Sequence, residues 1–379
     1  CEAGLAASAT IAQDRMLTVD GKRIFLLGLY ENPKDDSVLK QVADAGFTLV
    51  NIGPDAAALD RLKQFGLYGW VNTGASIDLS VDRPNREEEL RKMAATLAQH
   101  ASFLTWEVPD EALWNCWWIP QGWRGSEERW LQRQKINALA DTALADQLRA
   151  QRAEADRLHG LAEFRASEQI ADEIWAKLGT PSPKPGLNLS ESYENSLKLC
   201  EGMRAGYSFL KQIDTQHPVW MNHAPRNSAA DLKRFATAAD VVGCDIYPVP
   251  EFQGGHSDLM DRSLASVGAY TARMQDSAPS KPVWMVLQGF GWSDLEKDAT
   301  EESRKKNKRP TFGESRFMAY DAIVRGARGI LYWGTAYIEK DSQLWADLLK
   351  LVRELADLQP VLSAADVPVQ PEVKLAPWS

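Results

Sequence analysis

The strongest constraint on the fold is that short, continuously apolar runs alternate with amphipathic stretches along most of the chain. Runs of this kind are typical of strands that are buried on both faces of a parallel sheet. We expect such strands at 24–30, 47–52, 67–71, 103–108, 218–222, 241–247, 282–288 and 329–333. Each is followed by a predicted helix, at 37–45, 57–65, 86–100, 191–213, 228–237, 263–277, 312–326 and 342–358.

Eight strand–helix units in succession predict an α/β fold, a closed (β/α)8 TIM barrel. We expect the barrel over residues 17–360, with an N-terminal tether at 1–16 and a C-terminal extension at 361–379. One long insertion, 114–190, interrupts the alternation after the fourth strand. Its Ala-, Arg-, Glu- and Leu-rich part, 127–178, favours helix throughout and predicts a helical hairpin packed outside the barrel.

Charge and motif content exclude several classes of protein. The net charge of −9 argues against a nucleic-acid-binding protein, which should carry a basic face. The four cysteines show no C-x-x-C spacing, the five histidines are scattered, and H-E-x-x-H, G-x-S-x-G and phosphate-loop motifs are absent. We therefore expect no metal site and no cofactor. No stretch approaches the ~18 apolar residues of a membrane-spanning helix.

The first residue is Cys1 rather than methionine, and a small, polar stretch follows it. This start is typical of a mature bacterial lipoprotein, whose N-terminal cysteine carries lipid; the alternative is an arbitrary start to the sequence. The first interpretation predicts membrane anchoring through Cys1 and a place in the cell envelope, in the periplasm or on the surface. The second leaves a secreted protein. Nothing in the sequence indicates an oligomeric state.

The active site of such a barrel lies where its strands end at their carboxyl termini. At those ends the sequence places carboxylates, amides and aromatic side chains, all expected to converge on one rim. The candidate residues are Tyr30, Glu31, Asn72, Glu107, Asp110, Glu111, Asn222, His223, Asp245, Tyr247, Gln288, Trp292 and Trp333. Acids and amides bind hydroxyl groups and aromatic faces stack on rings. A carbohydrate is therefore the expected ligand.

Several of these residues have a second interpretation. Glu107 is also typical of a buried structural partner, and Asp110 of a helix cap or of an orienting group for Glu111. His223 is better interpreted as a hydrogen-bonded rim residue than as a catalytic base. Five tryptophans open the insertion directly after strand four, and they predict one wall of the cleft, with Trp117 binding substrate; the alternative is a core for the insertion. The five are Trp114, Trp117, Trp118, Trp123 and Trp130.

Several short stretches stand in order along residues 17–360: 19–22, 28–30, 45–48, 103–106 with 110–111, 245–248, and 326–329 with 332–333. Together they resemble the clan A-type (β/α)8 glycoside hydrolases, especially the catalytic barrel of family 42-type β-galactosidases. The resemblance implies a glycosidase with an acid/base glutamate after strand four, which Glu111 matches, and a floor for the −1 subsite at Trp333. It also implies a nucleophilic glutamate after strand seven, where this sequence has Gln288.

An amide cannot ionise, so Gln288 leaves three explanations open. The hydrolase uses another carboxylate, Asp245 or Glu31, as base or nucleophile; Gln288 is an engineered replacement of glutamate; or the barrel is a non-catalytic glycan-binding lipoprotein. A structural scaffold whose mouth is plugged by the insertion is a fourth interpretation. For a hydrolase we expect Asp245 to lie ~6.5–9.5 Å from Glu111, which admits a water and predicts inversion. Gln288 then orients that water or a sugar hydroxyl.

Overall fold

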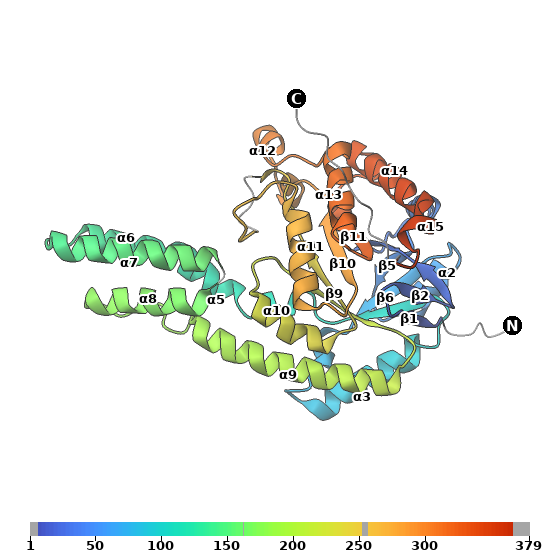
Figure 1. Ribbon diagram of the computed structural model, residues 1–379, viewed down its shortest axis with the longest axis horizontal. Coiled ribbons are helices and arrows are strands. Elements are labelled where there is room, and N and C mark those ends of the chain that lie inside the picture. Colours follow the sequence, from blue (N-terminus) through green and yellow to red (C-terminus); the bar gives the residue numbers. More distant parts are fainter. Residues whose placement is uncertain (1–6, 162, 252–256, 367–379) are drawn as a thin grey trace.

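The computed structural model describes residues 7–161, 163–251 and 257–366. Its centre is a closed barrel of eight parallel strands, which confirms the predicted (β/α)8 fold (Figure 1). All eight predicted strands are present, and their ends differ from the prediction by at most two residues. They are β4 (Leu26–Leu29), β5 (Leu49–Ile52), β6 (Tyr68–Asn72), β7 (Phe103–Glu107), β8 (Val219–His223), β9 (Val241–Asp245), β10 (Val283–Gln288) and β11 (Gly329–Trp333).

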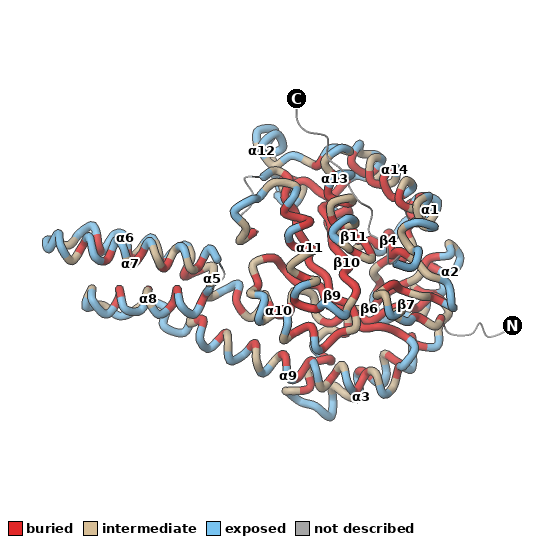
Figure 2. Tube along the Cα trace, in the orientation of Figure 1, coloured by how far each residue is buried: buried red, intermediate tan, exposed pale blue. Residues whose placement is uncertain are grey.

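Helices surround the barrel and turn their apolar sides towards it (Figure 2). They are α1 (Asp36–Ala45), α2 (Ala56–Lys63), α3 (Arg83–Leu97), α9 (Leu189–Ile213), α10 (Ala229–Phe235), α11 (Ser266–Ser277), α13 (Phe312–Val324) and α14 (Gln343–Asp357). Many begin at a side chain that accepts a hydrogen bond from the first turn, such as Asp35, Asp55 and Ser342. These caps fix where each strand-to-helix loop ends, and therefore the shape of the rim.

Large aromatic side chains fill the inside of the barrel. Trp70, Trp220 and Trp284 are fully buried there, with ring centroids 5.8 Å apart for the first pair and 5.6 Å for the second. Tyr30 sits on top of this layer, 5.0 Å from Trp70 and 5.5 Å from Trp220. The barrel is therefore packed solid below its mouth, and any ligand must bind above Tyr30.

A small antiparallel sheet closes the opposite end of the barrel. It consists of β1 (Ala9–Ile11), β2 (Leu17–Val19) and β3 (Lys22–Ile24), and its Ala9, Leu17 and Val19 pack against the barrel interior. The tether predicted over 1–16 is therefore wrong where the structure describes it, because β1 belongs to the barrel's floor. Cys1 and residues 367–379 lie outside the described residues. The predicted C-terminal extension begins inside a short helix, α15 (Gln359–Leu362).

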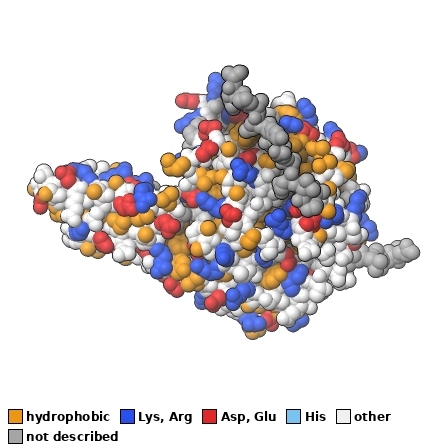
Figure 3. All heavy atoms as spheres, in the orientation of Figure 1, with side chains coloured by type: hydrophobic (Ala, Val, Ile, Leu, Met, Phe, Trp, Pro, Cys, Tyr) orange, Lys and Arg blue, Asp and Glu red, His pale blue; other side chains and the backbone are white. Residues whose placement is uncertain are grey.

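The insertion forms a helical arm that projects away from the barrel (Figure 1). Its elements are α4 (Ala112–Asn115), α5 (Trp118–Trp123), a π-helical turn η2 (Arg124–Glu128), α6 (Arg129–Asn137), α7 (Thr142–Gly160) and α8 (Phe164–Lys177). The prediction of a helical insertion outside the barrel is confirmed. The predicted hairpin of two helices is wrong, because a break near residue 140 divides the first helix into α6 and α7. Basic and acidic side chains alternate over the arm's surface (Figure 3).

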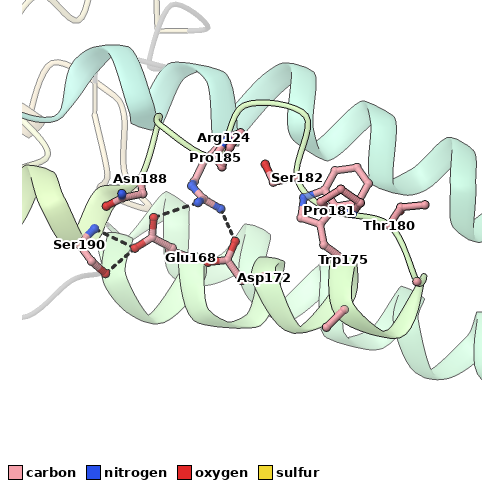
Figure 4. A pocket seen from close by; sticks show the side chains of 12 residues that line it. Arg124, Glu168, Asp172, Trp175, Thr180, Pro181, Ser182, Pro185, Asn188 and Ser190 are labelled. Atoms are coloured by element: carbon pink, nitrogen blue, oxygen red, sulfur yellow. Dashed lines mark hydrogen bonds and ion pairs between the residues drawn. The ribbon is translucent and has the colours of Figure 1, made fainter.

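A buried arginine fixes the root of the arm. Arg124 is almost fully buried and pairs with Glu128 at 3.1 Å. It also pairs with Glu168 at 3.0 Å and Asp172 at 2.9 Å (Figure 4). Glu168 in turn accepts hydrogen bonds from the backbone N–H groups of Leu189 and Ser190 at the start of α9. Arg124 therefore connects η2, α8 and α9, the three segments that carry the arm.

Removing Arg124 should loosen the arm. Arg124→Ala leaves Glu128 and Glu168 as buried acids without their cation, so we expect the free energy of unfolding of the arm to fall by roughly 3–5 kcal/mol. Hydrogen exchange of α8 and the first turns of α9 measures this change. Arg149→Ala is the control, because the Arg149–Asp146 pair is exposed and should contribute less than ~1 kcal/mol. Unchanged protection in Arg124→Ala would contradict the assignment.

Candidate active site

A hollow of about 250 Å³ opens at the end of the barrel where the parallel strands terminate. At ~30 Å³ per water molecule its volume equals about eight waters, which suits one small cyclic group better than a chain. Ten residues line it: Tyr30, Asp110, Glu111, Asn222, Asp245, Tyr247, Val286, Trp292, Leu295 and Trp333. The structure thus brings together most of the candidates that the sequence placed on the rim.

Glu107, the last residue of β7, lies below this hollow and does not line it. The side chain is buried and accepts three hydrogen bonds, from the Tyr30 hydroxyl at 2.6 Å, Trp70 Nε1 at 3.1 Å and Asn72 Nδ2 at 3.0 Å. Burial, with the nearby charge of Asp110, raises the pKa of Glu107 to about 8, although the three donors oppose the shift. The prediction that Glu107 and Asn72 contact substrate is therefore wrong: both hold Tyr30 in place from beneath.

Glu111 occupies a strained turn between β7 and α4. Its φ of 51° lies in the left-handed region, which non-glycine residues rarely adopt. Such strain persists only where the surroundings over-determine it, and it clusters at functional sites. The neighbouring Asp110 accepts a hydrogen bond from Asn222 Nδ2 at 3.0 Å, and burial raises the pKa of its carboxyl. Asp110 does not cap α4 with its side chain, so its contacts place it in the site.

Asp245 ends β9 and stands directly beside Glu111. Burial, and then the charge of Asp110, raises the pKa of Asp245 to about 8, while hydrogen bonds from Glu111 and Tyr247 oppose the shift. A hydrogen bond between two carboxyl groups requires one proton between them. Glu111 and Asp245 therefore form a pair that shares a proton. The expected separation of ~6.5–9.5 Å is wrong for this conformation, because direct contact leaves no room for a water.

Aromatic rings form the opposite wall. Tyr247 stacks on Trp333 with ring centroids 5.5 Å apart and an angle of 21° between the planes. Trp292 meets Tyr247 edge to face at 6.3 Å. Trp292 and Leu295 belong to a 3-10 turn, η5 (Trp292–Leu295), that follows β10. The hollow therefore has an acidic side and an aromatic side, the combination that a hydroxyl-bearing ring requires.

Gln288 does not face the hollow. It is fully buried, accepts a hydrogen bond from the Val249 N–H at 2.9 Å, and donates to the carbonyl oxygens of Val249 at 2.7 Å and Phe290 at 3.0 Å. The prediction that Gln288 orients a water or a sugar hydroxyl is wrong. A carboxylate here would face two carbonyl oxygens, so the amide fits this position, which contradicts an engineered replacement of glutamate. Val286 is the residue of β10 that lines the hollow.

Three further candidates lie away from the hollow. Glu31 pairs with Lys340 at 2.8 Å and accepts a hydrogen bond from Thr335 at 2.7 Å. These contacts hold its side chain against the loop after β11. His223 points outward from β8 and packs edge to face on Phe235, and burial lowers its pKa to about 4. Trp117 packs between Phe164 and Tyr193, at 5.6 and 6.2 Å. None of the three supports its predicted role in the site.

The predicted tryptophan wall is wrong for the same reason as Trp117. The short helix α4 leads the chain away from the mouth, so Trp114, Trp117, Trp118 and Trp123 all lie outside the residues that line the hollow. Trp123 is buried in the arm and Trp118 is half exposed. Because nothing from the arm lines the hollow, the interpretation of a scaffold with a plugged mouth is contradicted as well.

Val286 and Leu295 are lining residues that the sequence reasoning missed. Val286 follows from the alternation of β10, since Trp284 two residues earlier faces the barrel interior. Leu295 has no such signal, because it lies in a turn. Two hollows on the arm are larger, about 640 and 710 Å³, but Glu168 and Asp172, which line both of them, already pair with Arg124. The barrel-mouth hollow is therefore the better candidate for chemistry.

No group of three or more His, Cys, Asp or Glu side chains is arranged to hold a metal ion among residues 7–161, 163–251 and 257–366. In the same ranges no helix is both long and apolar enough to cross a membrane.

Comparison with solved structures places the barrel among glycoside hydrolases in fold. A β-galactosidase from the psychrophilic Marinomonas ef1 is 14% identical, with a TM-score of 0.53 over 88% of this chain and 59% of that one. A β-galactosidase from Halorubrum lacusprofundi is 14% identical, with a TM-score of 0.54 over 87% and 58%. β-Glucuronidase 2 of Bacteroides uniformis, bound covalently to cyclophellitol-6-carboxylate aziridine, is 15% identical, with a TM-score of 0.50 over 86% and 32%.

These likenesses define the fold as the (β/α)8 barrel of such enzymes, as the resemblance in the sequence implied. The chain spans less than two thirds of the length of each of these structures. No protein-family model matches the chain. No curated protein sequence matches it either.

The protonated carboxyl groups predict a loss of stability on the alkaline side. The pKa of Glu107 and of Asp245 is about 8 in the folded protein, against ~4.3 and ~3.9 in an unfolded chain, so the folded state binds more protons between these values. Unfolding free energy should fall as pH rises from about 5 to 8, by up to ~1.4 kcal/mol per pH unit for each group.

Chemical denaturation across this pH range measures the slope. Asp245→Asn should make the slope shallower, because one of the two titrating groups is gone. Asp44→Asn is the control, since Asp44 is exposed and its ion pair with Lys40 lies on the surface. A stability that rises between pH 5 and 8 would show that these carboxyls are ionised in the folded protein.

Proposed function

We propose that this protein is a glycoside hydrolase in which Glu111 protonates the glycosidic oxygen and Asp245 is the second carboxylate. The observation that carries the proposal is the hydrogen-bonded Glu111–Asp245 pair on the wall of a hollow whose other wall is aromatic. The fold shared with β-galactosidases and a β-glucuronidase supports a carbohydrate substrate. The substrate class is an oligo- or polysaccharide, of which one sugar ring occupies the hollow.

The electrostatics of the pair suit this division of labour. Burial and the neighbouring carboxylates make a second negative charge costly, so one proton stays on the pair at neutral pH. The two carboxyls share this proton in the empty site, and when a glycosidic oxygen enters between them Glu111 donates the proton to that oxygen. Glu111 is then the general acid and Asp245 is left ionised.

Direct contact favours attack by Asp245 itself. A sugar ring that separates the two carboxyls brings them towards the ~5–5.5 Å of retaining glycosidases more readily than to the wider spacing of inverting ones. The Asp245 oxygen forms a bond to C1 while the bond from C1 to the leaving oxygen breaks, and Glu111 supplies the proton to that oxygen. A water, deprotonated by Glu111, then hydrolyses the glycosyl ester and restores both groups. This conclusion replaces the inversion expected from the sequence.

Neighbouring residues position these groups and the sugar. Asn222 holds Asp110 through its Nδ2, and Tyr247 donates to Asp245. Tyr30, fixed by Glu107, forms the floor of the hollow. Trp333 presents its ring to the hollow from the stack with Tyr247, so it is the platform for the sugar face.

A second candidate function is glycan binding without hydrolysis. The observation that favours it is the apolar Val286 at the place on β10 where a carboxylate would otherwise line the hollow. Such a protein would bind the same sugars in the same hollow. The two functions separate in one experiment, because a binding protein retains affinity for a glycan panel but releases no product from it.

Lipid anchoring at Cys1, with its place in the cell envelope, stays a prediction from the sequence. Incorporation of labelled palmitate into the wild-type chain but not into Cys1→Ala tests it. Absence of label in both would contradict the anchor.

Substitution of Glu111 should reveal its role through the leaving group. Glu111→Gln removes the proton donor, so we expect kcat on a natural oligosaccharide to fall by at least about a hundredfold. The loss should be much smaller on an aryl glycoside whose phenolate leaves without protonation. Glu31→Gln is the control, since Glu31 is held by Lys340 and Thr335 outside the hollow, and it should keep near-wild-type activity. Equal losses on both substrates would show that Glu111 is not the acid.

The configuration of the first-formed product tests the role of Asp245. We expect NMR of the early reaction to show a product that keeps the substrate's anomeric configuration. A slowly released fluorosugar should label Asp245 covalently, as mass spectrometry of the digested protein would show. An inverted product, or label on a different residue, would exclude Asp245 as the nucleophile.

A further inference from the structure

The barrel-mouth hollow is lined by a buried acceptor that no described residue satisfies. Asn222 lies two residues beyond Trp220 on β8, so its side chain points into the barrel above the tryptophan layer. Its Nδ2 donates to Asp110 at 3.0 Å, which sets the orientation of the amide. Its Oδ1 is buried and accepts no hydrogen bond from the part of the chain that the structure describes. An unsatisfied buried acceptor costs ~1–3 kcal/mol, which favours a ligand that donates to it.

Asp110 is the centre of negative charge beside this acceptor. Burial, and then the charge of Asp110, raises the pKa of Tyr30, Glu107 and Asp245. These three side chains therefore lie close enough to Asp110 to be affected by its charge. A positively charged ligand group beside Asp110 offsets the repulsion between these acids.

Asp110 differs from other buried acids of this chain in having no described cation beside it. Glu168 pairs with Arg124 at 3.0 Å. Asp294 pairs with Arg309 at 2.7 Å. Within the described part of the chain, no lysine or arginine pairs with Asp110, and none of the ten residues that line the hollow is basic. Burial raises the pKa of the Asp110 carboxyl, so a cation supplied by the ligand stabilises its ionised form.

The polar groups on this side of the hollow present acceptors to a ligand. The Tyr30 hydroxyl has one proton and donates it to Glu107 at 2.6 Å, so only its oxygen is left for the hollow. Asn222 presents Oδ1, and Asp110 presents its carboxylate. A sugar hydroxyl carries one proton and donates to one acceptor only. An ammonium group carries three protons and a positive charge, so it matches both the number of acceptors and their charge.

We propose that the hollow binds an amino sugar, whose ammonium group donates hydrogen bonds to Asp110, Asn222 Oδ1 and the Tyr30 hydroxyl oxygen. The inference rests on the proposed function, because it names the substrate class of the same hollow. The face of the ring packs on Trp333, as the face of a neutral sugar does, so the preference for the amine resides in Asp110 and Asn222. N-acetylation removes the charge and two of the three protons. The hydrolase therefore selects amino sugars over their hydroxyl and N-acetyl counterparts.

Calorimetric titration of the full chain carrying Glu111→Gln measures binding without hydrolysis. The probes are aryl glycosides of gluco and galacto configuration, each as both anomers. Each is compared as the 2-amino-2-deoxy sugar, its N-acetyl form and the sugar with a 2-hydroxyl group. In the configuration that the hollow accepts, we expect the amino form to bind about tenfold more tightly than the hydroxyl form. The inference is overturned if no amino form binds more tightly than its hydroxyl counterpart.

Substitution of the two acceptors locates the preference. Asp110→Asn in the same background removes the charge but keeps an acceptor for Asn222, so the amino and hydroxyl forms should bind with equal affinity. Asn222→Ala removes the second acceptor and should also reduce the preference, and circular dichroism verifies that both variants are folded. Asp44→Asn removes the same charge from an exposed position and should keep the preference. A preference that survives in Asp110→Asn and Asn222→Ala, or that Asp44→Asn abolishes as well, overturns the assignment.

Failure of this inference differs from failure of the proposed function. Hydrolysis of neutral glycosides with no preference for amino sugars overturns the inference alone. A preference for amino sugars that depends on Asp110, with no product from any glycoside in the wild-type chain, supports the inference and overturns the hydrolase.

Discussion

The hydrogen bonds that converge on Glu107 determine the form of the barrel mouth. The barrel interior is filled by tryptophans, and the buried Trp70 N–H needs an acceptor that an all-apolar core cannot supply. Glu107 supplies it, and its remaining capacity binds Tyr30 and Asn72. Tyr30 consequently meets Trp70 and Trp220 edge to face and forms the floor of the hollow. The depth of the site is thus a consequence of how the core is packed.

The same carboxyl controls the charge of the site above it. One small region contains four acids: Glu107, Asp110, Glu111 and Asp245. Ionising all four in a buried environment is unfavourable, because burial and mutual repulsion both destabilise the charged forms. Protonated Glu107 lowers the total charge from below. The remaining protons are then shared near Asp110, Glu111 and Asp245, where a glycosidic oxygen can take one. A structural carboxyl therefore sets the conditions under which its neighbours work as acid and nucleophile.

The sequence predicted the parts of the fold that local patterns determine. Continuous apolar runs located all eight barrel strands, and the rule for strand ends brought Glu111, Asp245 and Trp333 to one rim. It failed where distant backbone decides the outcome. Gln288 stands at a strand end like Asp245, yet its amide is hydrogen-bonded to the backbone of Val249 and Phe290. Glu31 forms an ion pair with Lys340, which is more than 300 residues away in the sequence. Neither partner can be recognised from the residues beside Gln288 or Glu31.

The course of the chain into the arm explains why Glu111 lines the hollow and the tryptophans after it do not. The chain must reverse at the end of β7, and it does so at Glu111 itself, whose left-handed backbone aims the carboxyl into the mouth while α4 departs in another direction. The aromatic residues that follow are therefore used to pack the root of the arm against α8 and α9, where Trp117 meets Phe164 and Tyr193. Arg124 then fixes that root with three acids. The strained turn thus orients the acid and at the same time directs the aromatic residues that follow it into the packing of the arm.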